Sequence, residues 1–206
     1  MALAQKTLFL IAAIAFVAGS ANTVLSETVI QKKTSYFQIR GSTAEDLDRE
    51  LAYRGPVTKD TGSRHAGATK IKFGGEVTYA EKSGWCYVEK AKVTLDTHII
   101  LPQWKNRKGA SKELRLIWDT LSRDIKRHEE RHAEIARNAA RSMEKAFLKL
   151  RPQKTCEEMQ ARVAKDSKDL IAKHDREQAR FDRVEAANFD NRMIRLLRYR
   201  MQSQAK

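Results

Sequence analysis

The feature that most constrains the fold is one long stretch in which apolar side chains return every three or four residues. It covers residues 111–150, and this spacing places the apolar groups along one side of an α-helix. Such a helix gains most of its stability from packing, so the rest of the domain is expected to lie along it. The stripe consists of Leu114, Ile117, Leu121, Ile125, His128, His132, Ile135, Ala139, Met143, Phe147 and Leu150.

A second long helix is predicted to follow and to fold back on the first. Pro152 ends the first helix, and Thr155 with Glu158 has the spacing of a capping box that starts another. Two long helices joined by a short segment pack side by side in opposite directions. The inward positions of the second helix are Met159, Val163, Leu170, Ile171, His174, Phe181 and Phe189.

Three segments before the helices have the composition of β-strands. The last two are joined through a turn that ends in Ser83-Gly84, which predicts an antiparallel hairpin. A short helix over residues 43–54, capped by Thr43, is expected after the first strand. The predicted fold class is therefore α+β, with a small antiparallel sheet packed against two long antiparallel helices. The predicted strands are residues 34–40, 69–80 and 86–102.

The first residues are predicted to be a signal peptide. A short basic start precedes an apolar run over residues 7–17, followed by small residues typical of a cleavage site. The run is shorter than the ~20 residues that span a bilayer, so no transmembrane segment is expected after the signal is removed. We expect cleavage after Ala21, or as late as Ser26, then a domain over 27–190 and a basic, frayed tail over 191–206. The protein is expected to be periplasmic or secreted.

Export also bears on Cys86 and Cys156, which are the two cysteines of the chain. In an oxidising compartment, two such cysteines are most simply joined to each other. They are too far apart in the sequence to form a CxxC redox motif. We therefore expect a disulfide between them.

The chain is strongly basic, with 40 Lys and Arg against 26 Asp and Glu and a net charge of +14. Loss of Lys6 with the signal leaves 39 basic and 26 acidic residues, a net charge of +13. Such a surface favours contact with anionic lipids and polymers. Nucleic acid is the least available of these outside the cytosol, so we expect no nucleic-acid partner. We interpret the charge first as a solvated surface, and contact with an anionic envelope surface stays open.

His128 and His132 stand four residues apart on the long helix, so their rings project from one face, as two ligands of one metal ion require. Glu129 can reach a water molecule held by such an ion and take its proton. The five residues fit the pattern H-E-x-x-H. Two histidines kept only as core residues would be costly in an apolar stripe. The pattern therefore predicts a zinc site with Glu129 as the catalytic base.

A catalytic zinc ion needs a third protein ligand and an open fourth position. If the two helices fold back about Pro152, the residue opposite position 131 is near His174. His174 is therefore the predicted third ligand. Glu177 and Asp182 lie within two turns of it and are the alternatives. The other role open to His174 is that of a core histidine that hydrogen-bonds to a ligand.

Several segments of the chain follow one another in an order that is characteristic of one protein family. They are Arg54-Gly55-Pro56, the strand with Cys86, the run Ile-Ile-Leu-Pro-Gln-Trp at 99–104, Trp118, the motif His-Glu-Glu-Arg-His at 128–132, and Cys156. Together they resemble the DUF922 family of predicted secreted zinc-dependent proteases, over about residues 34–185. The resemblance implies a zincin-like α+β domain, metal binding by His128 and His132, and catalysis by Glu129.

The end of the resemblance departs from the family pattern. Members commonly show Tyr-Asp followed by a Thr and a His-Gly pair, and in the matching stretch, residues 181–188, only Asp182 is kept. If the family's histidine is a ligand, this chain has to use His174 or Asp182 instead.

The sequence thus predicts a zinc metallopeptidase that acts on peptide or protein substrates. Its substrate-binding residues are not specified, although the strand ending at Pro102 is the expected platform for an extended peptide. His98, on the same strand, is a candidate for stabilising the oxyanion. Two alternatives stay open. One is a non-catalytic, basic envelope protein with a structural metal, and the other is a zinc amidase or esterase that acts on envelope material.

Overall fold

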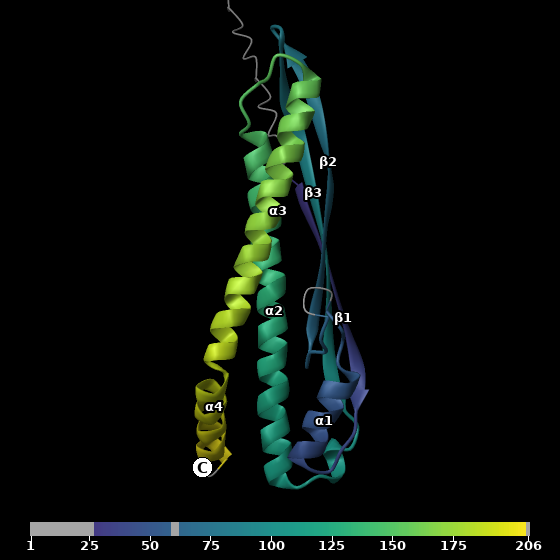
Figure 1. Ribbon diagram of the computed structural model, residues 1–206, viewed down its shortest axis with the longest axis vertical. Coiled ribbons are helices and arrows are strands. Elements are labelled where there is room, and N and C mark those ends of the chain that lie inside the picture. Colours follow the sequence, from purple (N-terminus) through teal and green to yellow (C-terminus); the bar gives the residue numbers. More distant parts are fainter. Residues whose placement is uncertain (1–26, 59–61, 205–206) are drawn as a thin grey trace, which may run out of the picture.

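The computed structural model describes residues 27–58 and 62–204, and its architecture is α+β (Figure 1). The predicted signal peptide lies outside the described residues. None of the helices in the described ranges is both long enough and apolar enough to cross a bilayer. The elements are β1 (Glu27–Ile39), α1 (Ala44–Arg54), β2 (Ala68–Lys82), β3 (Trp85–Trp104), a 3₁₀ turn (Arg107–Gly109), α2 (Lys112–Leu148), α3 (Cys156–Ala187) and α4 (Phe189–Gln204).

The strands form one sheet in the order β1-β3-β2. The predicted hairpin is confirmed: β2 and β3 are antiparallel, and Ser83 and Gly84 turn the chain with φ of 55° and 77°. The prediction of a wholly antiparallel sheet is wrong, because β1 runs parallel to β3 along its length. Alternation identifies a strand but leaves its partner and direction open. The sheet is therefore mixed.

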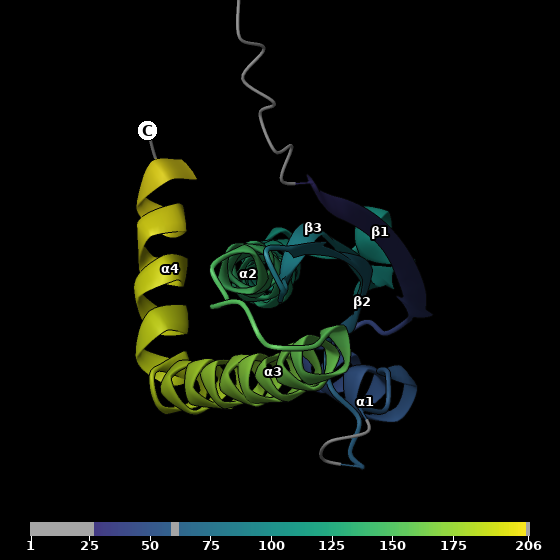
Figure 2. The same cartoon turned by 90° about the horizontal axis from the view of Figure 1, so that it is seen from above.

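Helix α2 lies lengthwise against the inner face of the sheet, and its 37 residues extend about 55 Å. Seen from above, the sheet lies on one side of α2, α3 on a second and α4 on a third (Figure 2). In the middle of α2 the predicted stripe is wrong by about one position. The residues buried there include Glu129, Ala133, Ala136 and Ala140. His128 and His132 are half-buried and contact α3 instead.

A separate apolar cluster closes the end of the molecule where α1 lies. Thr43 caps α1 by accepting a hydrogen bond from the Asp46 backbone, and the Asp46 carboxylate accepts one in return, as the sequence predicted. The rings of Trp104 and Trp118 meet edge to face at 5.8 Å. The buried members of the cluster are Ile39, Leu47, Leu51, Trp104, Leu114 and Trp118.

The predicted disulfide is present, with the Cα atoms of Cys86 and Cys156 5.1 Å apart. Cys86 also exchanges two backbone hydrogen bonds with Gln153, of 2.8 and 2.9 Å. Together they fasten the start of α3 to the hairpin. Closing a loop with a sequence separation of 70 stabilises the fold by about 4 kcal/mol in the chain-entropy model. A structural disulfide is typical of proteins outside the reducing cytosol.

Helix α3 runs back along α2 with few buried residues, namely Met159, Val163 and His174. The expectation that the tail frays is wrong. Residues 189–204 form α4, which packs against α2 and ends the described chain as a helix. The tail therefore belongs to the folded domain.

Candidate metal centre

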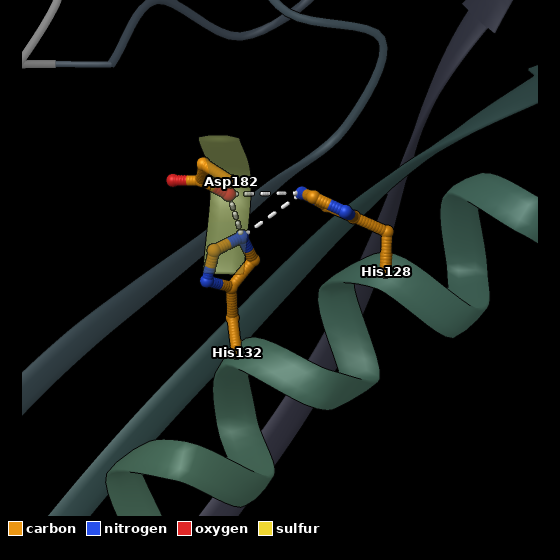
Figure 3. Close-up of side chains that lie close together, drawn as sticks. All are labelled: His128, His132 and Asp182. Atoms are coloured by element: carbon orange, nitrogen blue, oxygen red, sulfur yellow. Dashed lines mark hydrogen bonds and ion pairs between the residues drawn. The ribbon is translucent and has the colours of Figure 1, made fainter. Parts of the chain in front are cut away.

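Three side chains from two helices converge near the middle of α2 (Figure 3). His128 and His132 lie on α2, and Asp182 lies on α3. The Asp182 Oδ1 atom is 3.3 Å from His128 Nε2 and 2.9 Å from His132 Nε2, and the two Nε2 atoms are 3.0 Å apart. The structure thus brings both predicted histidines together with one of the two alternative third ligands.

The dimensions of this group suit a zinc ion. Zinc binds imidazole nitrogen and carboxylate oxygen at about 2.0–2.2 Å in a tetrahedral arrangement, which separates the ligand atoms by about 3.3 Å. The three observed separations, 2.9, 3.0 and 3.3 Å, are close to that value. The side chain of Asp182 is 52% exposed and that of His128 is 26% exposed. The group therefore faces solvent on one side.

Gln178 fixes which nitrogen of His132 carries its hydrogen. The Gln178 Nε2 atom donates to the His132 backbone carbonyl at 3.1 Å, so the amide oxygen must be the atom that lies 2.6 Å from His132 Nδ1. An amide oxygen only accepts, so Nδ1 donates to it. In the neutral ring, Nε2 is then left with a lone pair that points toward Asp182 and His128. Acceptors at Nδ1 play this part in many histidine metal sites.

The structure places His174 beside this group and not in it. Its Nε2 accepts a hydrogen bond from Gln178 at 2.8 Å, and its Nδ1 donates to Asp175 at 2.9 Å. Both ring nitrogens are therefore engaged, and the ring itself is buried against Phe73. Glu177 is exposed and lies 3.9 Å from Lys173 Nζ. Of the three candidates for the third ligand, Asp182 is the one that reaches the histidines.

Glu129 is buried next to the group, at 5% exposure, on the side of α2 that faces the sheet. Its carboxylate accepts a hydrogen bond of 2.8 Å from the hydroxyl of Thr69 on β2. Gly67 leaves room for it, because a Cβ at that position would lie 3.0 Å from Oε1. Burial raises the pKa of Glu129, and the Thr69 hydrogen bond and the two nearby histidines offset only part of that effect. A raised pKa suits a base that works near neutral pH.

A ring and a second carboxylate support His128. The Phe181 ring stacks on His128 at 4.9 Å and meets His132 edge to face at 5.1 Å. Glu185 Oε2 lies 3.7 Å from His128 Nδ1. Sequence reasoning missed Gln178 and Glu185. For Gln178 a signal existed: it lies four residues before Asp182, the spacing that also separates the two histidines on the antiparallel helix.

Two other predictions for the site are wrong. His98 lies between Thr97 and Ile99, which are buried toward α2, so it projects from the opposite face of the sheet, where Nε2 is 2.7 Å from Ser35 Oγ. It is therefore not placed to stabilise an oxyanion beside the three converging side chains. The strand that ends near Pro102 is β3, and both of its edges are paired, with β1 and with β2. It cannot accept a further strand.

The charges of the group predict how zinc binding depends on pH. Burial opposes the charge on His132, but hydrogen bonds to Asp182 and Gln178 outweigh it and raise its pKa. A zinc ion bound here would require the neutral ring, so its binding would release this proton. We expect zinc affinity to keep rising with pH above about 6.5, the ordinary pKa of histidine. Competition with a chelator between pH 5.5 and 8.5 measures this, and a flat profile contradicts it.

His132 and Asp182 also make the stability of the metal-free protein depend on pH, but this stability falls as the pH rises above neutral. Because the pKa of His132 is raised in the fold, its stabilising effect is complete below about 6.5 and is lost as the pH rises through the raised value. Burial of Asp182 is outweighed by its hydrogen bonds to both histidines, which lower its pKa, so its contribution is lost as the pH falls below about 3.9. Urea unfolding after chelation should therefore show less stability at pH 8 than at pH 5.5.

Comparison with known proteins identifies one family. A family model described as "Bacterial protein of unknown function (DUF922)" matches residues 34–189, about three quarters of the chain. No curated protein and no solved structure matches the chain. The matched region contains the three convergent side chains and Glu129.

Proposed function

The chain belongs to the DUF922 family of bacterial proteins, and we propose that it is a zinc-dependent metallopeptidase. The family description assigns no function, so the proposal rests on the site. The observation that carries it is the convergence of two Nε2 atoms and one carboxylate oxygen, all within 4.8 Å, beside a buried glutamate. Donors of this kind and number, with a side open to solvent, are typical of catalytic zinc.

In this proposal His128, His132 and Asp182 would hold the zinc ion. When bound, the ion would act as a Lewis acid and lower the pKa of a water molecule. Glu129 accepts a proton from the water that attacks the peptide carbonyl and passes it to the leaving amine. Thr69 orients the Glu129 carboxylate through its hydroxyl. Gln178 keeps the His132 lone pair directed at the ion by accepting the hydrogen of Nδ1.

The exposure of the site favours catalysis over a purely structural metal. A structural zinc site is closed by four protein ligands, whereas only three protein donors converge here among the described residues, and the Asp182 carboxylate is half exposed. An amidase or esterase would use the same water activation on a different bond. Substrate trials therefore have to include amide and ester compounds as well as peptides.

The sheet offers a platform for an extended substrate at β2. Its outer edge has no strand partner among the described residues, and its residue Thr69 contacts the catalytic base. A peptide that pairs with this edge would pass close to Glu129. We propose that the domain is zincin-like because an edge strand would pair with the substrate beside the catalytic base. That strand is β2, and not the strand ending at Pro102 that the sequence predicted.

The setting that we propose is the periplasm or the extracellular space, after removal of a signal peptide over residues 1–21. The disulfide is compatible with that setting. The partner is then a peptide or protein substrate, and the basic surface favours an anionic envelope surface nearby. Nucleic acid has no part in the proposal.

Zinc content is the first test. We expect elemental analysis of the purified, oxidised mature protein to give about one zinc per chain, as a three-ligand site requires. Hydrolysis of an unfolded protein substrate should stop with a chelator and return with added zinc. Glu177→Ala, on the same helix but exposed, is the matched control and should keep both metal and activity. An oxidised wild-type protein without zinc would overturn the proposal.

A further inference from the structure

Arg192 of α4 lies between the two helices that carry the converging side chains. Its Nε and Nη2 atoms donate to the two carboxylate oxygens of Asp124 on α2, at 3.0 and 3.1 Å. Its Nη2 is also 3.3 Å from Glu185 Oε2 on α3, and Nη1 donates to the Glu185 backbone carbonyl at 3.4 Å. One guanidinium therefore contacts α2 and α3 at the same time.

These contacts lie one turn away from the metal centre on each helix. Asp124 is four residues before His128, and Glu185 is three residues after Asp182. Glu185 also faces His128, with Oε2 3.7 Å from Nδ1. Arg192 thus joins α2 and α3 one turn away from the place where the ion would join them. It also binds the Glu185 carboxylate, which lies next to His128.

Burial makes this contact more than a surface ion pair. The side chains of Asp124 and Arg192 are only 4% and 13% exposed. A buried carboxylate without a partner is strongly unfavourable, and the planar fork of an arginine suits two carboxylate oxygens at once. Arg127 contacts the same two acidic residues, but its side chain is 44% exposed. Arg192 is therefore the cation that is fixed between the helices.

We propose that Arg192 is a positioning residue of the metal centre, and that α4 acts as a clamp which holds Asp182 and Glu185 of α3 at the right distance from His128 of α2. The inference rests on the proposed zinc site. Without Arg192, only the more exposed Arg127 still bridges the carboxylates of Asp124 and Glu185, and few buried residues of α3 resist its movement away from α2. The ligands then have to be brought together by the ion itself.

Arg192→Gln in the full-length protein tests the clamp through zinc affinity, measured by competition with a chromophoric chelator. We expect binding about 10–100-fold weaker than in the wild type, the range seen when residues that support metal ligands are replaced. Arg195→Gln is the matched control, because it removes the same charge from an exposed position of α4. It should leave the affinity within about twofold. Arg192→Lys keeps the charge without the fork, and should fall between the two.

A second measurement separates positioning from general stability. The visible absorption bands of bound cobalt report the ligand geometry, and they should change in Arg192→Gln but not in Arg195→Gln. Circular dichroism establishes whether each variant is folded. If Arg192→Gln does not fold, the same two measurements are made on Arg192→Lys. A folded Arg192→Gln protein with wild-type affinity and cobalt bands overturns the clamp alone. A wild-type protein that binds no zinc overturns the proposed function, and the clamp with it.

Discussion

Glu129→Gln should reduce peptide hydrolysis by about 10²–10⁴-fold, the usual contribution of a general base, while zinc content stays at the wild-type level. Glutamine has the same shape as glutamate, and its amide oxygen can still accept the hydrogen bond that Thr69 donates. It cannot accept the proton of the attacking water. Glu129 is not one of the three converging side chains, so the metal should stay bound. Turnover with a peptide substrate and elemental analysis of the same preparation measure both effects.

Glu130→Gln is the control for this prediction. Glu130 follows Glu129 on the helix, but its side chain is 37% exposed and pairs with Lys32 on β1 at 2.6 Å. The same change there should leave turnover close to that of the wild type. Two outcomes contradict the assigned role. Substantial turnover in Glu129→Gln means that another group is the base, and loss of zinc means that Glu129 supports the ligands and not the reaction.

The parts of the fold that local chemistry determines were predictable. Thr43 and Thr155 start helices where their hydroxyls accept a backbone hydrogen bond, and Ser83-Gly84 turns a hairpin because both residues adopt positive φ. These signals act over a few residues, so they can be read without knowing the rest of the chain. The H-E-x-x-H pattern is of the same kind, since its geometry is set within one helix.

The faces of α2 were harder to predict because three neighbours share them. Large side chains at helical spacing favour the face with His128, His132 and Ile135, yet the sheet packs against the smaller residues Ala133 and Ala136. Alanines let the helix approach the strands closely, and they give a weak hydrophobic signal. The histidines then fall on the side that faces α3, where both meet Asp182.

The register of α3 against α2 could not be read from the turn between them. Folding back about Pro152 pairs position 131 with His174, whereas the structure pairs His132 with Gln178, a shift of about one turn. The connecting segment does not turn directly, because Gln153 first pairs with Cys86 on the hairpin and Cys156 is bonded to the same residue. A contact 70 residues away in the sequence thus decides which side chain of α3 reaches the histidines.

This shift leads to a prediction about the third ligand. Asp182→Ala should remove one of three converging donors and weaken zinc binding by more than the about 10–100-fold expected of a supporting residue. His174→Ala should fall within that range, because it removes the acceptor that helps to hold the Gln178 amide and leaves all three converging donors in the chain. Chelator competition at one pH ranks the two variants.

The ranking decides between two arrangements of the same helices. If Asp182→Ala binds zinc more weakly than His174→Ala, the carboxylate is the ligand, and the buried histidine acts through Gln178 on the tautomer of His132. A His174→Gln variant should then recover part of the affinity, because its side chain can again accept from Gln178. If His174→Ala loses zinc and Asp182→Ala keeps it, α3 must shift by about two turns when the ion binds, because His174 lies eight residues before Asp182. That shift would have to break the hydrogen bonds that Gln178 makes to His132 and His174.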